Sequence, residues 1–344
     1  MKKDIKNETV WLDNTRIIAI FAVVLLHTAC EVTNRNGIES MQWLFGAMYD
    51  GISRWCVPIF VMISGALLLD PSKNESAVIF YKKRMSRILV PILFWSAFFV
   101  SWACYLGICR GEGPALDYHL DMWVKGEPYY HMWFMYMIVF LYLFTPVFRT
   151  VIANTTTRDL TFFVCAMFIL AGINACYASM HDGRSKVFSN WFLMYIPYYF
   201  AGYMIRHHKF SPSKLFLSTS AALLTVITFL GYYHFGKEYG IARGEYFYDY
   251  LSVTVIPTSI CLMYLFKSWN KPIISEQVTK KTAGLILGVY LVHPLALEFM
   301  TNGWFGFTSL SSSYSVPTFA AVIFLLSLAG AWVISKTPYL KRVI

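Results

Sequence analysis

The first apolar segment carries three polar side chains on one helical face, and one of them is a histidine that could take up a proton near neutral pH. In an α-helix, Arg16 and His27 lie about three turns apart, a rise of roughly 16 Å, and differ by about 20° around the axis. Glu31 follows His27 by one further turn on nearly the same face. An imidazole can take a proton from a hydroxyl group, and a neighbouring carboxylate can orient that imidazole. His27, Glu31 and Arg16 are therefore the candidate catalytic residues.

Both His27 and Arg16 also have a structural interpretation. The alternative for His27 is a hydrogen bond to a neighbouring helix that fixes helix packing. The alternative for Arg16 is an interfacial anchor that pairs with Asp13, the expected N-cap of the same helix. The spacing of the residues leaves these alternatives open.

A second candidate site precedes the third apolar segment. Arg84 and Arg87 are three residues apart, so both lie on one helical face at the expected cytoplasmic surface. Guanidinium groups bind phosphate oxygens in pairs, which predicts a site for a phosphorylated cofactor. The alternative is a basic cluster that only anchors the helix at the membrane surface.

Other polar or aromatic residues lie toward the expected outer side. His131 and Trp133 open the fourth apolar segment and His293 lies in the ninth, so these three are candidate substrate-binding residues or interfacial side chains. The seven cysteines lack metal-ligand spacing, and we predict no metal site. Ser64 beside Gly65 indicates close helix packing.

The helices that position these residues are predicted from composition. Charged residues make up 14% of the chain and hydrophobic residues 57%, which leaves too little polar surface for a water-soluble particle. Apolar runs of roughly 20 residues recur throughout. We therefore predict an all-α integral membrane protein with about ten transmembrane helices, forming a single membrane domain over residues 1–344 with no appended soluble domain. The predicted spans are 12–33, 43–69, 86–107, 130–148, 160–180, 191–205, 215–234, 250–266, 283–300 and 316–335.

Basic residues predict the orientation of these helices. Most of the 29 Lys and Arg residues fall in alternate loops if the amino terminus is cytoplasmic, and positive loops are retained inside. An even number of spans then places both termini in the cytoplasm. The net charge of +10 is spread over these loops and not gathered on one face, so we expect membrane lipid and no nucleic acid as a partner.

Several segments together resemble a known family. They include an Arg and a His separated by ten residues and an Arg-x-x-Arg motif, and they occur in the family's order. In this way the chain resembles the acyltransferase 3 family of membrane acyltransferases. The similar segments are residues 11–16 with 22–27, 57–65, 84–87, 130–134 and 288–294. Residues 150–280 match the family only as a hydropathy pattern.

The resemblance implies a bacterial inner-membrane enzyme, multi-pass in topology. It implies transfer of an acyl group, usually acetyl, from cytoplasmic acetyl-CoA to a hydroxyl of a cell-envelope glycan or lipid-linked sugar. Arg84, Arg87 and Arg16 would bind the phosphates of the donor, and His27 would activate the acceptor or carry the acyl group briefly. The acceptor, the acyl group, the number of transfer steps and the oligomeric state stay open.

A buried Arg and a buried His on one helical face also suit a different class of protein. A proton-coupled transporter or flippase of a small polar or lipid-linked substrate is the main alternative. Transporters are often built from internal repeats, and the two halves of this sequence contain no repeat that we can detect. A structural or partner-binding membrane protein is the third option, and it would not need Arg16 and His27 to align.

Overall fold

The computed structural model describes residues 2–72, 75–180, 191–301 and 312–344, and these segments contain helices and no strand. The helices are α1 (Lys2–Arg35), α2 (Met41–Ser53), α3 (Cys56–Leu68), α4 (Ala77–Cys109), α5 (Leu116–Val124), α6 (Trp133–Ala153), α7 (Thr157–Met180), α8 (Trp191–His207), α9 (Lys214–Tyr239), α10 (Ile241–Gly244), α11 (Val255–Lys267), α12 (Glu276–Gly284), α13 (Ile286–Thr301) and α14 (Ser312–Lys336). Short 3-10 helices cover Glu245–Tyr248 (η2) and Leu340–Arg342 (η4).

Many of these helices have the length and hydropathy of membrane spans. In the described residues, seven segments qualify: α1, α2 together with α3, α4, α6, α7, α9 and α14. The pair α12 and α13 adds an eighth if it is counted as one broken span. An all-helical, multi-pass membrane protein is therefore confirmed.

The predicted count of ten depends on two shorter helices. The predicted spans 191–205 and 250–266 correspond to α8, of 17 residues, and α11, of 13 residues. Each is shorter than the roughly 20 residues that usually cross the hydrocarbon core. The count of ten and the cytoplasmic location of both termini stay predictions.

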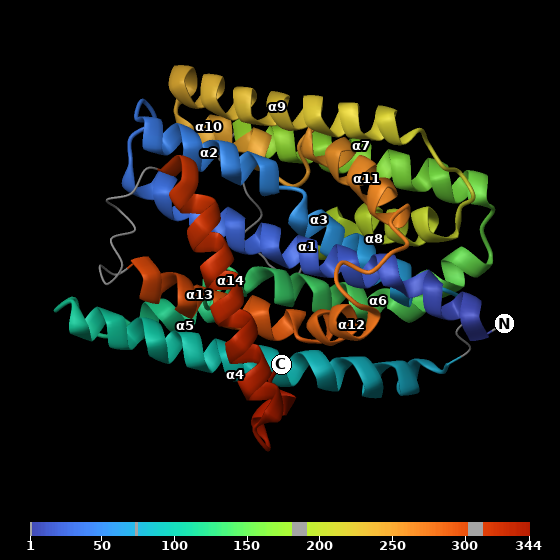
Figure 1. The fold of residues 1–344 in the computed structure, drawn as a ribbon, viewed down its shortest axis with the longest axis horizontal. Coiled ribbons are helices and arrows are strands. Elements are labelled where there is room, and N and C mark those ends of the chain that lie inside the picture. The colour runs from blue at the N-terminus through green and yellow to red at the C-terminus, as the bar shows by residue number, and fades with distance from the viewer. Residues whose placement is uncertain (1, 73–74, 181–190, 302–311) are drawn as a thin grey trace.

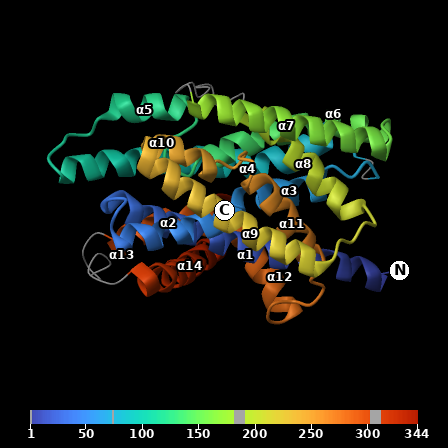
Figure 2. The same cartoon turned by 90° about the horizontal axis from the view of Figure 1, so that it is seen from above.

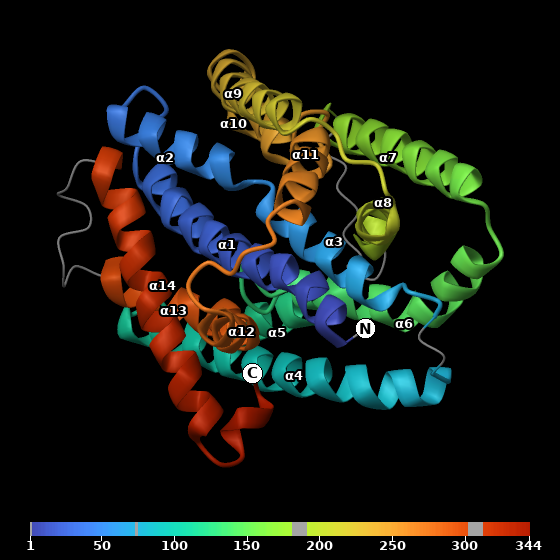
Figure 3. The same ribbon diagram turned by 45° about the vertical axis from the view of Figure 1, so that its right-hand side comes forward.

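Helix α1 lies inside the helix bundle. It packs against α2, α3, α12, α13 and α14, and Figure 3 shows these helices around it. Its residues from Leu12 to Val32 include many fully buried apolar side chains, as a helix with neighbours on several sides requires. The polar residues of α1 therefore face other helices as well as lipid.

Most helices begin at one side of the bundle and end at the opposite side, so the described loops gather at these two sides (Figure 1). Asn14, near the start of α1, donates a hydrogen bond to the backbone oxygen of Lys271, and Arg206 at the end of α8 donates to the backbone oxygen of Ala66 in α3. Figure 1 places the amino terminus at the same end as the connections from α3 to α4, α6 to α7 and α8 to α9. The short helix α5 lies toward the opposite end (Figure 2). The end with the amino terminus is the one that the basic loops predict to be cytoplasmic.

Helices α3 and α8 cross at very short range. A Cβ atom on Gly65 of α3 would overlap the backbone oxygen of Tyr199, and one on Gly202 of α8 would overlap that of Met62. Only glycine allows two helix backbones to approach this closely. The close packing predicted from Ser64 and Gly65 is confirmed.

Candidate active site

A cavity of about 480 Å³ lies between α1, α3, α4, α6 and the pair α12–α13. Arg16 of α1 and both Arg84 and Arg87 of α4 line it. Most of the other lining side chains are apolar, and Ser64, Tyr142 and Tyr290 are the exceptions that carry a hydroxyl group. The fold thus brings together the three arginines that the sequence assigned to phosphate binding, although α1 and α4 are far apart in the chain.

A break in a membrane helix forms one wall of this cavity. Helices α12 and α13 meet at an angle of 62°, and Ala283, Gly284, Ile286 and Leu287, on either side of the bend, line the cavity. Backbone polar groups freed by such a break are tolerated in a membrane where they face a cavity and not lipid. The predicted span 283–300 contains this break, which its apolar sequence does not reveal.

The three arginines differ in the partners they have. Arg16 Nη1 donates a 2.9 Å hydrogen bond to Asp13, which is the pairing expected of an interfacial anchor. Arg84 has a buried Nε with no hydrogen-bond partner among the described residues. An unpaired buried donor costs about 1–3 kcal/mol, and an anion bound in the cavity would remove that cost. Arg84 is therefore better prepared than Arg16 to bind a phosphate.

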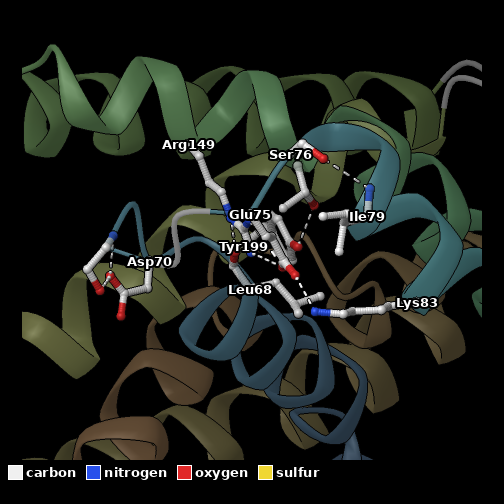
Figure 4. Close-up of polar contacts among 10 residues, drawn as sticks. Leu68, Asp70, Glu75, Ser76, Ile79, Lys83, Arg149 and Tyr199 are labelled. Carbon is white, nitrogen blue, oxygen red and sulfur yellow. Dashed lines mark hydrogen bonds and ion pairs between the residues drawn. The ribbon is translucent and has the colours of Figure 1, made fainter.

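Ion pairs brace the loop at the rim of the cavity, between α3 and α4 (Figure 4). Arg149 of α6 donates a 2.7 Å hydrogen bond to the backbone oxygen of Leu68, a cavity residue, and also pairs with Glu75. Glu75 accepts a further bond of 3.1 Å from Lys83. Burial alone would raise the pKa of Glu75, but its hydrogen bonds and the charges of Lys83 and Arg149 outweigh burial and hold that pKa below its usual value. The sequence analysis assigned no role to this cluster.

A group of histidines lies next to the cavity, behind one of its lining residues, Tyr290. Phe134 and Tyr290 line the cavity there, and the Tyr290 hydroxyl donates a hydrogen bond to the backbone oxygen of His131. The ring centroid of Tyr290 lies 5.1 Å from that of His131 and 6.0 Å from that of His293. Tyr290 therefore separates the arginine-lined cavity from the histidines by the thickness of one side chain.

His27, His131 and His293 form what we call the three-histidine cluster. The ring of His293 lies 5.2 Å from that of His27 and 5.4 Å from that of His131, measured between centroids. His131 and His293 are buried, with 1% and 0% of their surface exposed, whereas His27 is half-buried. The sequence analysis gave these residues separate roles on three segments, and it contained no signal that they converge.

Hydrogen bonds define the free nitrogen atoms of this cluster. His293 Nδ1 lies 2.6 Å from the backbone oxygen of Tyr290, and a carbonyl only accepts, so Nδ1 carries the proton. His293 Nε2 is then a hydrogen-bond acceptor, and it has no partner among the described residues. Neither ring nitrogen of His131 has one there either. No group of His, Cys, Asp or Glu side chains in the described part of the chain is arranged to hold a metal ion.

Two of the predicted site residues lie away from the cluster's free nitrogens. Arg35 Nε donates a 2.6 Å hydrogen bond to Glu31, and the hydrogen bonds of the described residues do not include one from Glu31 to His27. The ring of Trp133 lies 5.8 Å from Tyr250 and 6.0 Å from Tyr195. Their roles as an orienting carboxylate and a substrate contact stay predictions.

Another carboxylate lies near the cluster on α13. Glu298 accepts a 2.6 Å hydrogen bond from Trp102 Nε1 and a second hydrogen bond from the Tyr129 hydroxyl. The Tyr129 ring lies 5.9 Å from the ring of His131. The five-residue spacing from His293 to Glu298 could have drawn attention to this residue, but its aromatic partners come from distant segments.

The fold and the site define a multi-pass membrane protein in which an arginine-lined cavity extends to Tyr290, whose ring contacts two of three clustered histidines. The family model described as "Acyltransferase domain" (Acyl_transf_3) matches residues 9–336, so the chain belongs to this family of acyltransferases. No curated protein and no solved structure matches the chain. The resemblance found in the sequence motifs is thereby confirmed at the level of the family.

Proposed function

We propose that the protein is an O-acetyltransferase of the bacterial cytoplasmic membrane. It moves an acetyl group from cytoplasmic acetyl-CoA to a hydroxyl of a cell-envelope glycan or lipid-linked sugar on the outer side. The observation that carries this proposal is that one cavity has Arg16, Arg84 and Arg87 on its walls and also Tyr290, which lies beside the three-histidine cluster.

The cavity has the features that an acyl-CoA donor needs. Coenzyme A carries anionic phosphates at one end and a thioester at the other, joined by a flexible arm. Arg84 and Arg87, with Arg16, offer guanidinium donors to the phosphates, and the unpartnered Nε of Arg84 favours an anionic ligand. The mostly apolar walls between the arginines and Tyr290 suit the arm. In this arrangement the thioester lies at Tyr290, and a movement of this one side chain brings the thioester to the histidines.

His27 activates the acceptor in this proposal. It is the half-buried member of the cluster, so it is the imidazole with access to a second substrate. Its ring takes the proton of the acceptor hydroxyl as the oxygen attacks the thioester carbon. The alternative is a transient acyl group on His27 itself, followed by transfer to the acceptor.

The acceptor class follows from resemblance. The length of the chain and its expected ten-helix body resemble the O-acetyltransferase of enterobacterial common antigen. The match to the family model includes residues 150–280, which the motifs alone assigned to the family only as a hydropathy pattern.

One observation favours a second candidate function. The 62° bend between α12 and α13 beside a polar cavity also occurs in transporters, where broken helices line the substrate path. A proton-coupled transporter or flippase would use the same cavity for its cargo, and it would not bind acetyl-CoA.

The test is binding of acetyl-CoA to the purified protein by calorimetry. We expect the wild type to bind and the Arg84→Ala, Arg87→Ala double variant to raise the Kd by about tenfold or more, because hydrogen bonds to charged groups contribute about 1.5–3 kcal/mol each. The matched control is Arg158→Ala with Lys214→Ala, which removes two exposed basic residues outside the cavity. Its Kd should stay within about twofold of the wild type. A folded wild type that does not bind acetyl-CoA would favour the transporter.

A further inference from the structure

We propose that His131 is a second catalytic residue, whose ring N–H stabilises the negative charge that develops on the thioester oxygen during acyl transfer. This inference rests on the proposed acetyl-CoA chemistry. It adds an electrostatic role that is separate from the proton transfer assigned to His27.

The ring of His131 is buried with its polar atoms unpaired in the described part of the chain. The side chain is 1% exposed, and neither ring nitrogen has a hydrogen-bond partner among the described residues. A neutral imidazole always carries one N–H donor and one acceptor nitrogen. A buried donor without a partner costs about 1–3 kcal/mol, and such a group calls for an explanation. A partner that exists only during the reaction would explain it.

Packing against aromatic rings of the described residues, and not hydrogen bonding, fixes the position of the His131 ring. Aromatic rings surround it: Phe99 at 5.0 Å, Tyr290 at 5.1 Å and Tyr129 at 5.9 Å between centroids. The Tyr290 hydroxyl bonds to the backbone oxygen of His131 and not to its ring. The imidazole is therefore fixed in place while its N–H stays available, which is the arrangement that electrostatic catalysis requires.

His131 lies close to both the end of the cavity and the other histidines. Tyr290 lines the arginine cavity and contacts His131, while His293 contacts both His131 and His27. His131 thus contacts Tyr290 at the end of the proposed donor cavity, and its ring is linked to the proposed base, His27, through the ring of His293. A thioester carbonyl that reaches the histidines from this cavity has its oxygen near His131.

The structure also distinguishes His131 from His293. The single N–H of neutral His293 is at Nδ1, where it is used by the backbone oxygen of Tyr290. The free nitrogen of His293 is an acceptor, so it cannot stabilise an oxyanion. Of the two fully buried imidazoles, only His131 has an N–H to offer.

The chemical step balances with the groups present. The acceptor hydroxyl gives its proton to His27, and its oxygen forms a bond to the thioester carbon, which moves an electron pair onto the carbonyl oxygen. His131 donates its N–H to that oxyanion. The pair then returns, the carbon–sulfur bond breaks, and the thiolate takes the proton from His27. The same oxyanion forms if His27 carries the acyl group first.

Two variants of His131 test this role. We would measure release of the coenzyme A thiol from acetyl-CoA in detergent, with an octyl glucoside as the source of acceptor hydroxyls. His131→Phe keeps an aromatic ring but has no donor, and we expect kcat to fall by about 10²–10³-fold while the Kd of acetyl-CoA stays within about twofold. His131→Asn keeps an N–H donor, so it should be at least about tenfold faster than the Phe variant.

A control variant and three possible results decide whether His131 has this role. His234→Phe changes an exposed histidine outside the cluster and is the control, which should keep wild-type rates. Equal losses in the Asn and Phe variants, wild-type rates in the Phe variant, or loss of acetyl-CoA binding in both variants would overturn the role of His131 and leave the acetyltransferase function standing. A folded wild type that neither binds acetyl-CoA nor releases thiol would overturn both proposals.

Discussion

His27 differs from the other two histidines of the cluster in what it can reach. Its ring lies 4.9 Å from that of Tyr130, a residue that is 46% exposed, and 5.2 Å from that of buried His293. An imidazole that must meet a second substrate needs such access, whereas a group that only stabilises charge works best when it is fully buried. The separate roles proposed for His27, as the base, and for His131, as the group that stabilises charge, follow from this difference in burial.

Replacing His27 tests its chemical role at the residue scale. We expect His27→Ala to lower acetyl transfer by about 10²–10⁴-fold, the usual effect of removing a general base, while the protein still inserts into the membrane. The measurements are thiol release from acetyl-CoA, and the yield and elution volume of the detergent-solubilised protein. Leu25→Ala shortens a half-buried side chain on the same helix and should remain active. Wild-type rates in folded His27→Ala would exclude His27 as base or acyl carrier.

At the scale of elements, apolar length was sufficient to predict most helices, and helical periodicity was sufficient to place Arg84 beside Arg87. Neither could predict the bend between α12 and α13, because the apolar segment 283–300 begins only two residues before the break and the rest of α12 is polar. Contacts between helices that are far apart in the sequence could not be predicted either. The three-histidine cluster joins α1, the turn before α6 and α13, and no spacing within one helix encodes that meeting. Arg35 illustrates a local limit, since it lies one turn beyond Glu31 and pairs with it.

The crossing of α3 and α8 gives a prediction at this scale. We expect Gly65→Ala to destabilise the protein by about 1–3 kcal/mol, because the new methyl group forces the two backbones apart. Thermal unfolding of the purified protein in detergent measures the effect. Gly37→Ala is the matched control, since a Cβ there would meet no atom within 4 Å. Equal unfolding temperatures for Gly65→Ala and the wild type would contradict the close approach of these helices.

The whole molecule has two chemically different ends. The end with the amino terminus carries the rim contacts of Arg149, Glu75 and Lys83 and lies beside the arginines of the cavity. The opposite end carries Glu298 with its aromatic partners, beyond the three-histidine cluster. A donor that enters at the basic end and an acceptor that enters at the other would meet at the histidines. This arrangement is productive only if the basic end faces the cytoplasm.

The side of the membrane on which each later loop lies depends on the short helices α8 and α11. If both cross the membrane, the chain has ten spans, with Lys209 in the cytoplasm and Arg243 outside. If neither crosses, both of these positions change sides, while both termini stay inside. We would introduce Lys209→Cys and Arg243→Cys separately into a variant lacking the seven native cysteines, and label intact spheroplasts with a membrane-impermeant maleimide. Gly37→Cys, in the first connection, is outside in either case and is the control. Labelling of Arg243→Cys without Lys209→Cys is the expected result, and the reverse would rule out ten spans.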